Sequence, residues 1–392
     1  MTEANRREKI RILHIIQSKG GVERYIRSFL KYIDHNKFYN IIVCSQDYKS
    51  DDYVDLADEF ETVTMVRDID IKADISAIFT IRKLIKKYHS DILYCHSSKA
   101  GAIGRIAALG MKNKCIYNPH GWAFNMNCSN KKKKLYAIIE RMLARMTDRI
   151  VCISKAEQES ALDKRICKKE KTVVIYNGID FEEYENSQGE LTRETAGIKK
   201  DAFVVGFVGR LSEQKSPDIF AKTAVLIKHK IPNAFFLMVG DGELRSEVEK
   251  IFKDNGMEQS YLITGWVNNP MTFIQLFDIA TLLSRWEGFG LVLAEYMLAG
   301  KPIVASNVDA IPNIIENEIN GLVSELNEEE ISENVFSLYR DSSLREKLCS
   351  NGKKIVRERY DVRRVVAEHT ELFIETLNFT HKAQYGVGGK KD

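Results

Sequence analysis

The sequence contains no long apolar run. No stretch of its 392 residues reaches the roughly 18 consecutive apolar residues that a membrane-spanning helix needs. The first residues, MTEANRREKIRILHII, also lack the apolar core of a secretory signal peptide. These two absences predict a cytoplasmic protein.

Cysteine pairs are also absent. The seven cysteines are scattered along the chain and never follow the spacing Cys-x-x-Cys. An odd number of scattered cysteines argues against a disulfide framework and against a structural zinc site. We therefore expect reduced thiols and no structural zinc site.

Acidic residues are missing from residues 92–139, which contain eight basic ones. Residues 1–180 hold 33 Lys and Arg against 22 Asp and Glu, whereas the rest of the chain holds 25 against 33. The first half should therefore meet an anionic partner. No recognised nucleic-acid-binding motif is present, so we predict that this partner is not a nucleic acid.

Short apolar runs of strand length alternate with helical patterns along the chain. A first set lies at 10–16, 40–45, 91–97, 115–120 and 149–154, and a second set lies at 203–209, 234–240, 261–265, 279–284 and 301–306. Strands that alternate with helices predict a parallel sheet with helices on both faces. The two sets therefore predict an α/β protein of two Rossmann-like, doubly wound domains.

A polar, helix-poor segment, TVVIYNGIDFEEYENSQGELTRETAGIKKD, separates the two sets of strands. We place the domain boundary within it, at about 178–200. This boundary predicts an N-terminal domain over residues 1–178 and a C-terminal domain over residues 200–360.

In open parallel sheets ligands bind at the carboxyl ends of the strands, so the loops that follow the strands are the places to search. The loop GRLSEQK follows the first strand of the second set and carries Arg210 and Lys215. A guanidinium and an ammonium on one loop complement a diphosphate. Taken alone, the same loop is more typical of a solvated basic surface than of a diphosphate site.

The stretch RWEGFGLVLAEYM follows another strand of the second set and places two carboxylates, Glu287 and Glu295, eight positions apart. Gly288 and Gly290 allow backbone amides to approach a ligand, next to the positive end of the helix that follows. Carboxylates accept hydrogen bonds from vicinal hydroxyls, and a nucleoside diphosphate sugar has such diols on its ribose and its hexose. A structural alternative for Glu287 is an ordinary helix N-terminus enriched in Glu.

With these motifs in place, the chain resembles the retaining glycosyltransferases of family four. The resemblance rests on SKGG, NPHGW, NGID, GRLSEQK, VGDGE, TGW, EGFGLVLAE and GKPIVAS, which occur in this order from Arg11 to about Leu377. It implies the GT-B fold, in which two Rossmann-like domains face a cleft and the last helix, about 361–380, crosses back onto the first domain. One departure is VDAIPNII, where Asp309 and Asn313 replace the Gly-Gly-x-x-Glu run that is frequent in the family.

The resemblance implies roles for residues of the second domain. Glu295 would bind the ribose, Glu287 the donor sugar, and Arg210 with Lys215 the diphosphate. Gly288, Phe289 and Gly290 would supply backbone contacts to the phosphate and the sugar. The segment around Gly265 and Trp266 would hold the base.

In the first domain, the resemblance implies that Gly20 and Gly21 approach the diphosphate and that His120 contacts the donor sugar beside the reacting carbon. Without the resemblance, His120 is more typical of a turn residue with a satisfied imidazole than of a sugar contact. His96 follows another strand and is either a second residue of the cleft or a core partner. We interpret it as lying at the edge of the cleft.

The implied reaction is transfer of a hexose or amino sugar from a nucleotide sugar, by default a UDP-sugar, with retention at the anomeric carbon. The acceptor would be a glycan or a polyprenyl-diphosphate-linked sugar of cell-surface polysaccharide biosynthesis. No cofactor or divalent cation is expected, because Arg210, Lys215 and amides would meet the charge of the leaving diphosphate. A sugar-nucleotide 2-epimerase of the same fold is the alternative, and it would release an epimerised sugar without an acceptor.

A further class, the nicotinamide dehydrogenases, is disfavoured because neither SKGGVE nor EGFGLV completes Gly-x-Gly-x-x-Gly after a strand. A sensing protein without catalysis is disfavoured by the intact Glu287, Glu295, Arg210 and Lys215.

A basic amphipathic helix is predicted within residues 129–149, where Lys131–Lys134 precede apolar residues at helical spacing: Leu135, Ile138, Ile139, Met142 and Leu143. Such a helix can lie on an anionic membrane surface, which would make the protein peripheral to the inner face of the plasma membrane. The alternative is a surface helix that packs its apolar stripe on the sheet.

Overall fold

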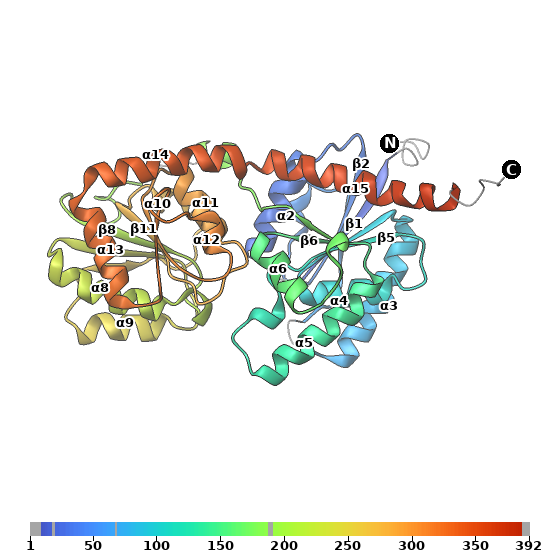
Figure 1. Ribbon diagram of the computed structural model, residues 1–392, viewed down its shortest axis with the longest axis horizontal. Helices are drawn as coiled ribbons and strands as arrows, with labels where there is room; N and C mark the ends of the chain where they lie inside the picture. The colour runs from blue at the N-terminus through green and yellow to red at the C-terminus, as the bar shows by residue number, and fades with distance from the viewer. Residues whose placement is uncertain (1–8, 18–19, 67–68, 187–190, 386–392) are drawn as a thin grey trace. The chain divides into compact units, whose positions relative to one another are not determined.

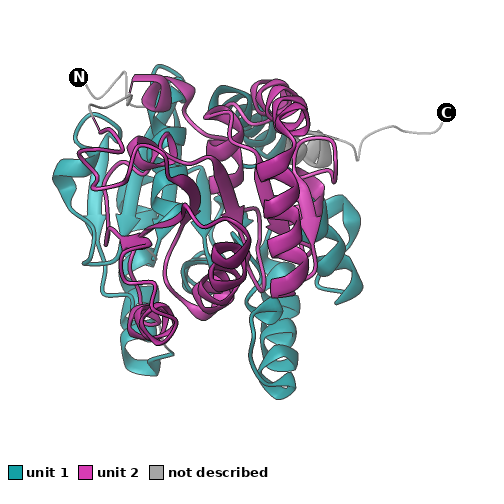
Figure 2. Ribbon diagram, turned by 90° about the vertical axis from the view of Figure 1, so that its left-hand side faces the viewer, with its two compact units in different colours: residues 1–177, 362–392 teal, residues 178–361 magenta. Residues whose placement is uncertain are grey.

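The computed structural model describes residues 9–17, 20–66, 69–186 and 191–385 (Figure 1). The chain forms two compact units (Figure 2). Unit 1 comprises residues 1–177 and 362–392, and unit 2 comprises residues 178–361. The segment 178–200, in which we place the domain boundary, belongs to unit 2.

Unit 1 is built on a parallel sheet of seven strands in the order β3-β2-β1-β4-β5-β6-β7. The strands are β1 (Ile10–Ile16), β2 (Phe38–Cys44), β3 (Glu59–Thr62), β4 (Ile92–His96), β5 (Lys114–Asn118), β6 (Arg149–Cys152) and β7 (Thr172–Val174). The central strands β1, β2 and β4 are nearly continuous apolar runs because helices cover both of their faces.

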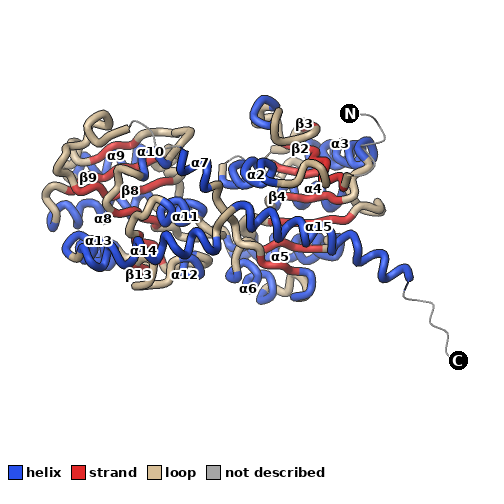
Figure 3. The backbone as a smooth tube through the Cα atoms, turned by 90° about the horizontal axis from the view of Figure 1, so that it is seen from above, coloured by secondary structure: helices blue, strands red, loops and turns tan. Residues whose placement is uncertain are grey.

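Helices cover this sheet on two sides (Figure 3). On one face, α2 (Gly21–Tyr32) and α15 (Val362–Tyr385) pack against residues such as Ile12 and Ile16. The other face, with Leu13 and Ile15, is covered by α3 (Ile71–Tyr88), α4 (Ser98–Ala107), α5 (Asn130–Leu143) and α6 (Lys155–Asp163). The helix α15 therefore returns from the far end of the sequence to lie beside α2 (Figure 1).

Short 3-10 turns connect these elements of unit 1. They are η1 (Ser50–Tyr53), η2 (Ala123–Asn125), η3 (Ala144–Met146) and η4 (Lys169–Lys171).

Unit 2 contains a parallel sheet of six strands in the order β10-β9-β8-β11-β12-β13. The strands are β8 (Phe203–Val208), β9 (Ala234–Val239), β10 (Tyr261–Ile263), β11 (Ile279–Leu282), β12 (Ile303–Ser306) and β13 (Leu322–Ser324). The helical segments are α7 (Phe181–Asn186), η5 (Glu213–Lys215), α8 (Pro217–Lys230), α9 (Arg245–Asp254), α10 (Met271–Ile274), α11 (Leu291–Leu298), α12 (Ile311–Ile314), α13 (Glu328–Arg340) and α14 (Ser342–Arg359).

The predicted fold class, two doubly wound parallel sheets, is confirmed. Three strands are missing from the prediction, namely β3, β7 and β13, and each lies at the edge of its sheet. The strand β7 and the helix α7 lie in the segment that we interpreted as a polar, helix-poor connection, so that interpretation is wrong for both. Within the described part of the chain, no helix combines the length and the apolar character needed to cross a bilayer.

Candidate functional site

The loops after β8 and β11 meet at the carboxyl edge of the unit 2 sheet. The backbone N–H of Arg285 donates to the carbonyl of Gln214 at 2.8 Å, and the Gln214 side chain donates to the carbonyl of Trp286 at 3.1 Å. The guanidinium of Arg285 also donates to both carboxylate oxygens of Asp218, at 3.0 and 2.7 Å. Bidentate bonds of this kind fix orientation, so the two loops form one rigid assembly.

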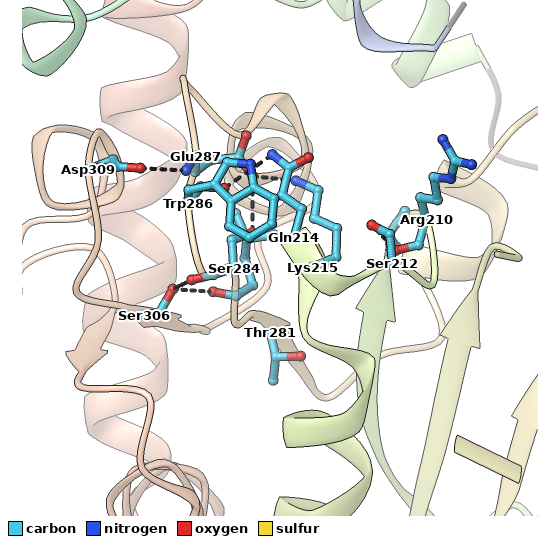
Figure 4. A network of polar contacts seen from close by, with 12 residues as sticks. Arg210, Ser212, Gln214, Lys215, Thr281, Ser284, Trp286, Glu287, Ser306 and Asp309 are labelled. Atoms are coloured by element: carbon cyan, nitrogen blue, oxygen red, sulfur yellow. Dashed lines mark hydrogen bonds and ion pairs between the residues drawn. The ribbon is translucent and has the colours of Figure 1, made fainter. Parts of the chain in front are cut away.

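Glu287 lies at the centre of this assembly (Figure 4). Its Oε2 contacts the ammonium of Lys215 and is 3.0 Å from the hydroxyl of Ser284. The Glu287 side chain is only 9% exposed. The structure therefore brings together two of the residues predicted for the site, although 72 positions separate them in the sequence.

Asp309 stands where the sequence departs from the pattern of the family. Its carboxylate accepts a hydrogen bond from the backbone N–H of Glu287 at 2.9 Å, and its own φ is 43°. The carboxylate of Asp309 therefore fixes the turn that carries Glu287.

The helix α11 begins after Gly290, whose φ of 81° lies in the left-handed region that favours glycine. Glu295 lies one turn inside this helix and is 1% exposed. Its Oε1 accepts a hydrogen bond from the hydroxyl of Tyr184 at 2.6 Å. The ring of Phe289 is buried against Tyr360, with 5.4 Å between the ring centroids. The side chain of Phe289 therefore serves packing, and only its backbone is available to a ligand at the Gly288–Gly290 loop.

Arg210 and Trp266 lie at more exposed places. Arg210 is 53% exposed and forms an ion pair with Glu243 at 3.3 Å. Figure 4 shows it apart from the Lys215–Glu287 pair. Gly265 bridges to Gly240, which joins the loops after β10 and β9, and the side chain of Trp266 is 69% exposed. Arg210 and Lys215, which the sequence predicts to act together, therefore pair with different carboxylates, those of Glu243 and Glu287.

In unit 1, Gly20 precedes the first residue of α2, Gly21. Gly20 has a φ of 102° and accepts a hydrogen bond from the N–H of Arg24 at 3.0 Å. Both glycines are exposed. Ser18 and Lys19 of the SKGG motif lie outside the described residues.

His120 follows β5 and has a φ of 49°. The backbone N–H of His120 donates to Oδ1 of Asn118 at 3.1 Å, and this hydrogen bond stabilises the turn. The ring of Tyr25, on α2, packs edge-on against the imidazole of His120 at 4.9 Å.

Glu157 supports the same turn from α6, and sequence reasoning missed it. Its carboxylate accepts the N–H of Gly121 at 2.7 Å and the N–H of Ile153 at 2.6 Å. Burial raises the pKa of Glu157 to about 7, although these two donors lower it. The available signal was the capping box Ser154-x-x-Glu157, in which the Ser154 hydroxyl accepts the Glu157 N–H at 3.1 Å.

His96 is fully buried, so our interpretation of it as a residue at the edge of the cleft is wrong. One of its ring nitrogens lies 3.1 Å from Nε2 of His120, and the other lies 3.5 Å from Nδ1 of His14. Nε2 of His14 in turn lies 3.2 Å from Oδ1 of Asn40. Because His14 lies inside the strand β1 rather than after it, the rule that ligands bind at the carboxyl ends of strands does not point to it.

The basic helix α5 does not turn its whole apolar stripe toward the sheet. Its inward face carries Glu140, which accepts hydrogen bonds from Arg105 at 2.8 Å and from the Tyr117 hydroxyl at 2.9 Å. Three residues of the apolar stripe face outward, with exposures of 50% for Leu135, 48% for Ile138 and 51% for Met142. The interpretation that this stripe packs on the sheet is therefore wrong for these three residues.

Among the residues that the structure describes, no group of three His, Cys, Asp or Glu side chains is placed to hold a metal ion. At the carboxyl edge of unit 2, the ammonium of Lys215 pairs with Glu287 and the guanidinium of Arg210 pairs with Glu243.

Two family models match successive parts of the chain. The model described as Glycosyltransferase Family 4 matches residues 19–183, and the model described as Glycosyl transferases group 1 matches residues 189–355. Together they cover most of unit 2 and residues 19–177 of unit 1, but not the helix α15.

Individual relatives agree with these models. The chain is 28% identical over 378 residues to the UDP-Gal:alpha-D-GlcNAc-diphosphoundecaprenol alpha-1,3-galactosyltransferase of Escherichia coli, which covers 94% of this chain and 98% of that enzyme. It is 31% identical over 322 residues to an uncharacterized 41.2 kDa protein in the cps region of Klebsiella pneumoniae. This match covers 80% of this chain and 85% of that protein. Among solved structures, HepE of Anabaena in complex with UDP and glucose is similar in fold, with a TM-score of 0.81, 23% identity and coverage of 93% and 100%.

Proposed function

The chain belongs to the family four glycosyltransferases of GT-B fold, and we propose that it moves a hexose or an amino sugar from a UDP-sugar to a lipid-linked or glycan acceptor in cell-surface polysaccharide biosynthesis. The resemblance to the Escherichia coli galactosyltransferase supports UDP-galactose as the first donor to test and an amino sugar on undecaprenyl diphosphate as the first acceptor. The complex of HepE with UDP and glucose supports a uridine donor.

We base the proposal on the Lys215–Glu287 contact at the carboxyl edge of the unit 2 sheet. Lys215 meets the diphosphate, and the carboxylate of Glu287 accepts hydroxyl hydrogen bonds of the donor sugar. The loop backbone of Gly288, Phe289 and Gly290 and the positive end of α11 add further donors for the phosphate oxygens.

The remaining residues complete donor binding. Glu295 binds the ribose, the segment of Gly265 and Trp266 holds the base, and Arg210 exchanges its exposed partner Glu243 for the diphosphate. In unit 1, Gly20 and Gly21 contact the diphosphate and His120 contacts the donor sugar.

The chemical step proposed is a front-face substitution with retention. The acceptor oxygen bonds to the anomeric carbon while the bond from that carbon to the diphosphate oxygen breaks, and the leaving oxygen takes the proton of the acceptor hydroxyl. No protein carboxylate acts as a nucleophile in this step. Lys215, Arg210 and backbone N–H groups stabilise the charge on the leaving diphosphate, so no divalent cation is required.

We further propose that the enzyme works in the cytoplasm, on the inner face of the plasma membrane, where α5 holds it. Four successive lysines, Lys131–Lys134, precede the outward-facing Leu135, Ile138 and Met142. Basic side chains beside exposed apolar ones complement an anionic lipid surface. The bond between Glu140 and Arg105 keeps the opposite face of α5 on unit 1.

A transfer assay tests the proposed function. The full chain is incubated, with EDTA, with an N-acetylglucosamine diphosphate lipid and each of UDP-galactose, UDP-glucose and their N-acetylamino counterparts, and products are identified by mass spectrometry and NMR. We expect one donor to give a lipid product with an α-anomeric bond. A free epimerised sugar made without acceptor would instead support the epimerase.

Two matched carboxamide variants make the assay specific. Glu287→Gln should lower kcat by about a hundredfold or more because an interaction at the reacting sugar is lost. Glu333→Gln removes a carboxylate that also contacts a lysine, Lys230, but is 64% exposed, and it should leave kcat unchanged. Equal activity of both variants would contradict the role of Glu287.

A further inference from the structure

Three histidines of unit 1 form a continuous row across adjacent strands. His14 lies on β1, His96 ends β4, and His120 follows β5, and these strands are neighbours in the sheet. Because Ile16 is in register with His96, the row climbs diagonally toward the carboxyl edge. His14 and His96 are fully buried, whereas His120 is partly exposed.

The partners of these rings fix a direction along the row. In the orientation that the structure gives the Asn40 amide, its oxygen faces Nε2 of His14 at 3.2 Å, and its nitrogen is buried without a hydrogen-bond partner among the described residues. Because an amide oxygen only accepts, Nε2 of His14 carries the hydrogen in this orientation. Nδ1 of a neutral His14 is then bare and accepts from Nε2 of His96 at 3.5 Å. By the same rule, Nδ1 of His96 is bare and accepts from Nε2 of His120 at 3.1 Å. Nδ1 of His120 is therefore left as an acceptor.

The surroundings keep the row neutral. Burial lowers the pKa of His14 to about 4 and the pKa of His120 to about 3. For His96, burial and then the neighbouring His120 lower the pKa well below its usual range. A neutral row matters because a protonated ring would donate from both nitrogens and break the direction.

We propose that His96 is a positioning residue that holds His120 in the Nε2–H tautomer, so that Nδ1 of His120 accepts a hydrogen bond from one hydroxyl of the donor sugar. Nδ1 of His120 has no hydrogen-bond partner among the described residues. The sugar contact itself rests on the proposed function. The tautomer assignment does not, because it follows from contacts within unit 1.

Such an acceptor selects among sugars in a defined way. A donor sugar with hydrogen or fluorine at the contacted position cannot donate, so both analogues lose the bond. A histidine that donated from Nδ1 would instead tolerate fluorine better than hydrogen.

Two matched amide variants test the positioning role. In His96→Asn, the amide oxygen takes the place of Nδ1 and can still accept from His120. In His96→Gln, the amide reaches the place of Nε2 and faces His14, which leaves His120 without its acceptor. We expect kcat/KM of His96→Gln to fall about tenfold or more and that of His96→Asn to stay within about threefold of wild type.

Analogues of the donor provide a readout that a merely structural role would not move. The panel comprises UDP-galactose and its deoxy and deoxyfluoro analogues at each of the positions 3, 4 and 6. At one position, the wild-type enzyme should have a kcat/KM for both analogues that is about tenfold lower than its kcat/KM for UDP-galactose. In His96→Gln, the same difference between UDP-galactose and the two analogues should shrink to under about threefold. Discrimination that is unchanged in His96→Gln would overturn the proposal.

The tautomer is measured directly by NMR of the full chain with 15N-labelled histidine. The expected spectrum shows Nε2–H for His14, His96 and His120, with the His120 hydrogen protected from exchange. An Nδ1–H tautomer of His120 would overturn the proposal whatever the activity. Absence of transfer from every nucleotide sugar would overturn the proposed function and the sugar contact with it, whereas this spectrum would still support the fixed tautomer.

Discussion

The hydroxyl of Tyr184, on α7, donates to Oε1 of Glu295, on α11, at 2.6 Å. Both side chains are buried, and 111 positions separate them in the sequence. Because a hydrogen bond to a buried carboxylate contributes about 1.5–3 kcal/mol, Tyr184→Phe should lower the free energy of unfolding of the protein by about this amount. Urea unfolding measures it.

The same variant also tests the role of Glu295 in donor binding. A less constrained carboxylate should raise KM for the nucleotide sugar several-fold and leave kcat nearly unchanged. Tyr339→Phe, at an exposed position, is the control and should change neither quantity. A stable Tyr184→Phe variant with the wild-type KM would show that this bond has no part in donor binding.

The ion pair of Arg105 and Glu140 predicts a larger effect on stability. Its two charges are 2.8 Å apart, with side-chain exposures of 0% and 5%. Glu140→Gln would leave the guanidinium buried without its counter-charge and should cost about 3–5 kcal/mol in the free energy of unfolding. Replacement of both partners by Met and Leu should recover most of this loss in urea unfolding, and a double variant as unstable as Glu140→Gln would contradict the explanation.

The buried histidines predict acid sensitivity. Burial lowers the pKa of His14 and of His369 to about 4, from 6.5 for an unperturbed histidine. Between these pH values the unfolded chain binds protons that the folded chain does not, so the stabilisation is complete above pH 6.5 and is lost as the pH falls. The loss should reach about 2 kcal/mol for each of these two histidines at pH 5.

Glu157 acts in the opposite sense. Its pKa is raised to about 7 by burial, so its contribution is greatest below the unfolded pKa and declines as the pH rises through about 7. Urea unfolding at pH 5, 6 and 7.5 should show a net loss toward acid that is smaller in His369→Gln and unchanged in His229→Gln, which alters an exposed histidine. Equal pH dependence in all three proteins would contradict the assignment.

The outward face of α5 predicts binding to anionic vesicles. Wild type should float with vesicles of equal parts phosphatidylcholine and phosphatidylglycerol and should not float with phosphatidylcholine alone. Changing Lys131–Lys134 to Gln should weaken this binding about tenfold or more, since each lysine contributes about 1 kcal/mol near the surface.

The apolar and control variants separate the two contributions to vesicle binding. Leu135→Ser with Met142→Ser should weaken binding even at high salt, where the lysines are screened. Lys347→Gln with Lys354→Gln, on the exposed face of α14, should bind as wild type does. Flotation of all variants to the same extent would contradict the membrane role of α5.

The central strands and the edge strand β10 were predictable, whereas the edge strands β3, β7 and β13 were not. Strands such as β1 and β8 are apolar runs because they are covered on both faces. The edge strand β3 reads Glu-Phe-Glu-Thr and is at most half-buried, so its sequence has no apolar run. The strands β7 and β13 have only three residues each, which is too short for periodicity to separate them from loops.

The candidate site was predictable only as a set of loops. The rule that ligands bind at the carboxyl ends of parallel strands identified the loops of Lys215 and Glu287. Side-chain orientation, which the sequence does not give, decides three further contacts. These are the contact between Lys215 and Glu287, the ion pair of Arg210 with Glu243, and the hydrogen bond from the backbone of Glu287 to Asp309. The row from His14 to His120 depends on strand order, and periodicity gave the helix α5 without showing that its polar Glu140 faces inward.

Calorimetric titration of the protein with UDP in the presence of EDTA tests the central claim most directly, that the carboxyl edge of the unit 2 sheet binds the nucleotide diphosphate. We expect saturable binding by wild type and affinities lowered about tenfold or more in Lys215→Ala and Glu295→Ala, since each loses a contact to a charged or buried group. Wild-type affinity in both folded variants, or no UDP binding by the folded wild type, would contradict it.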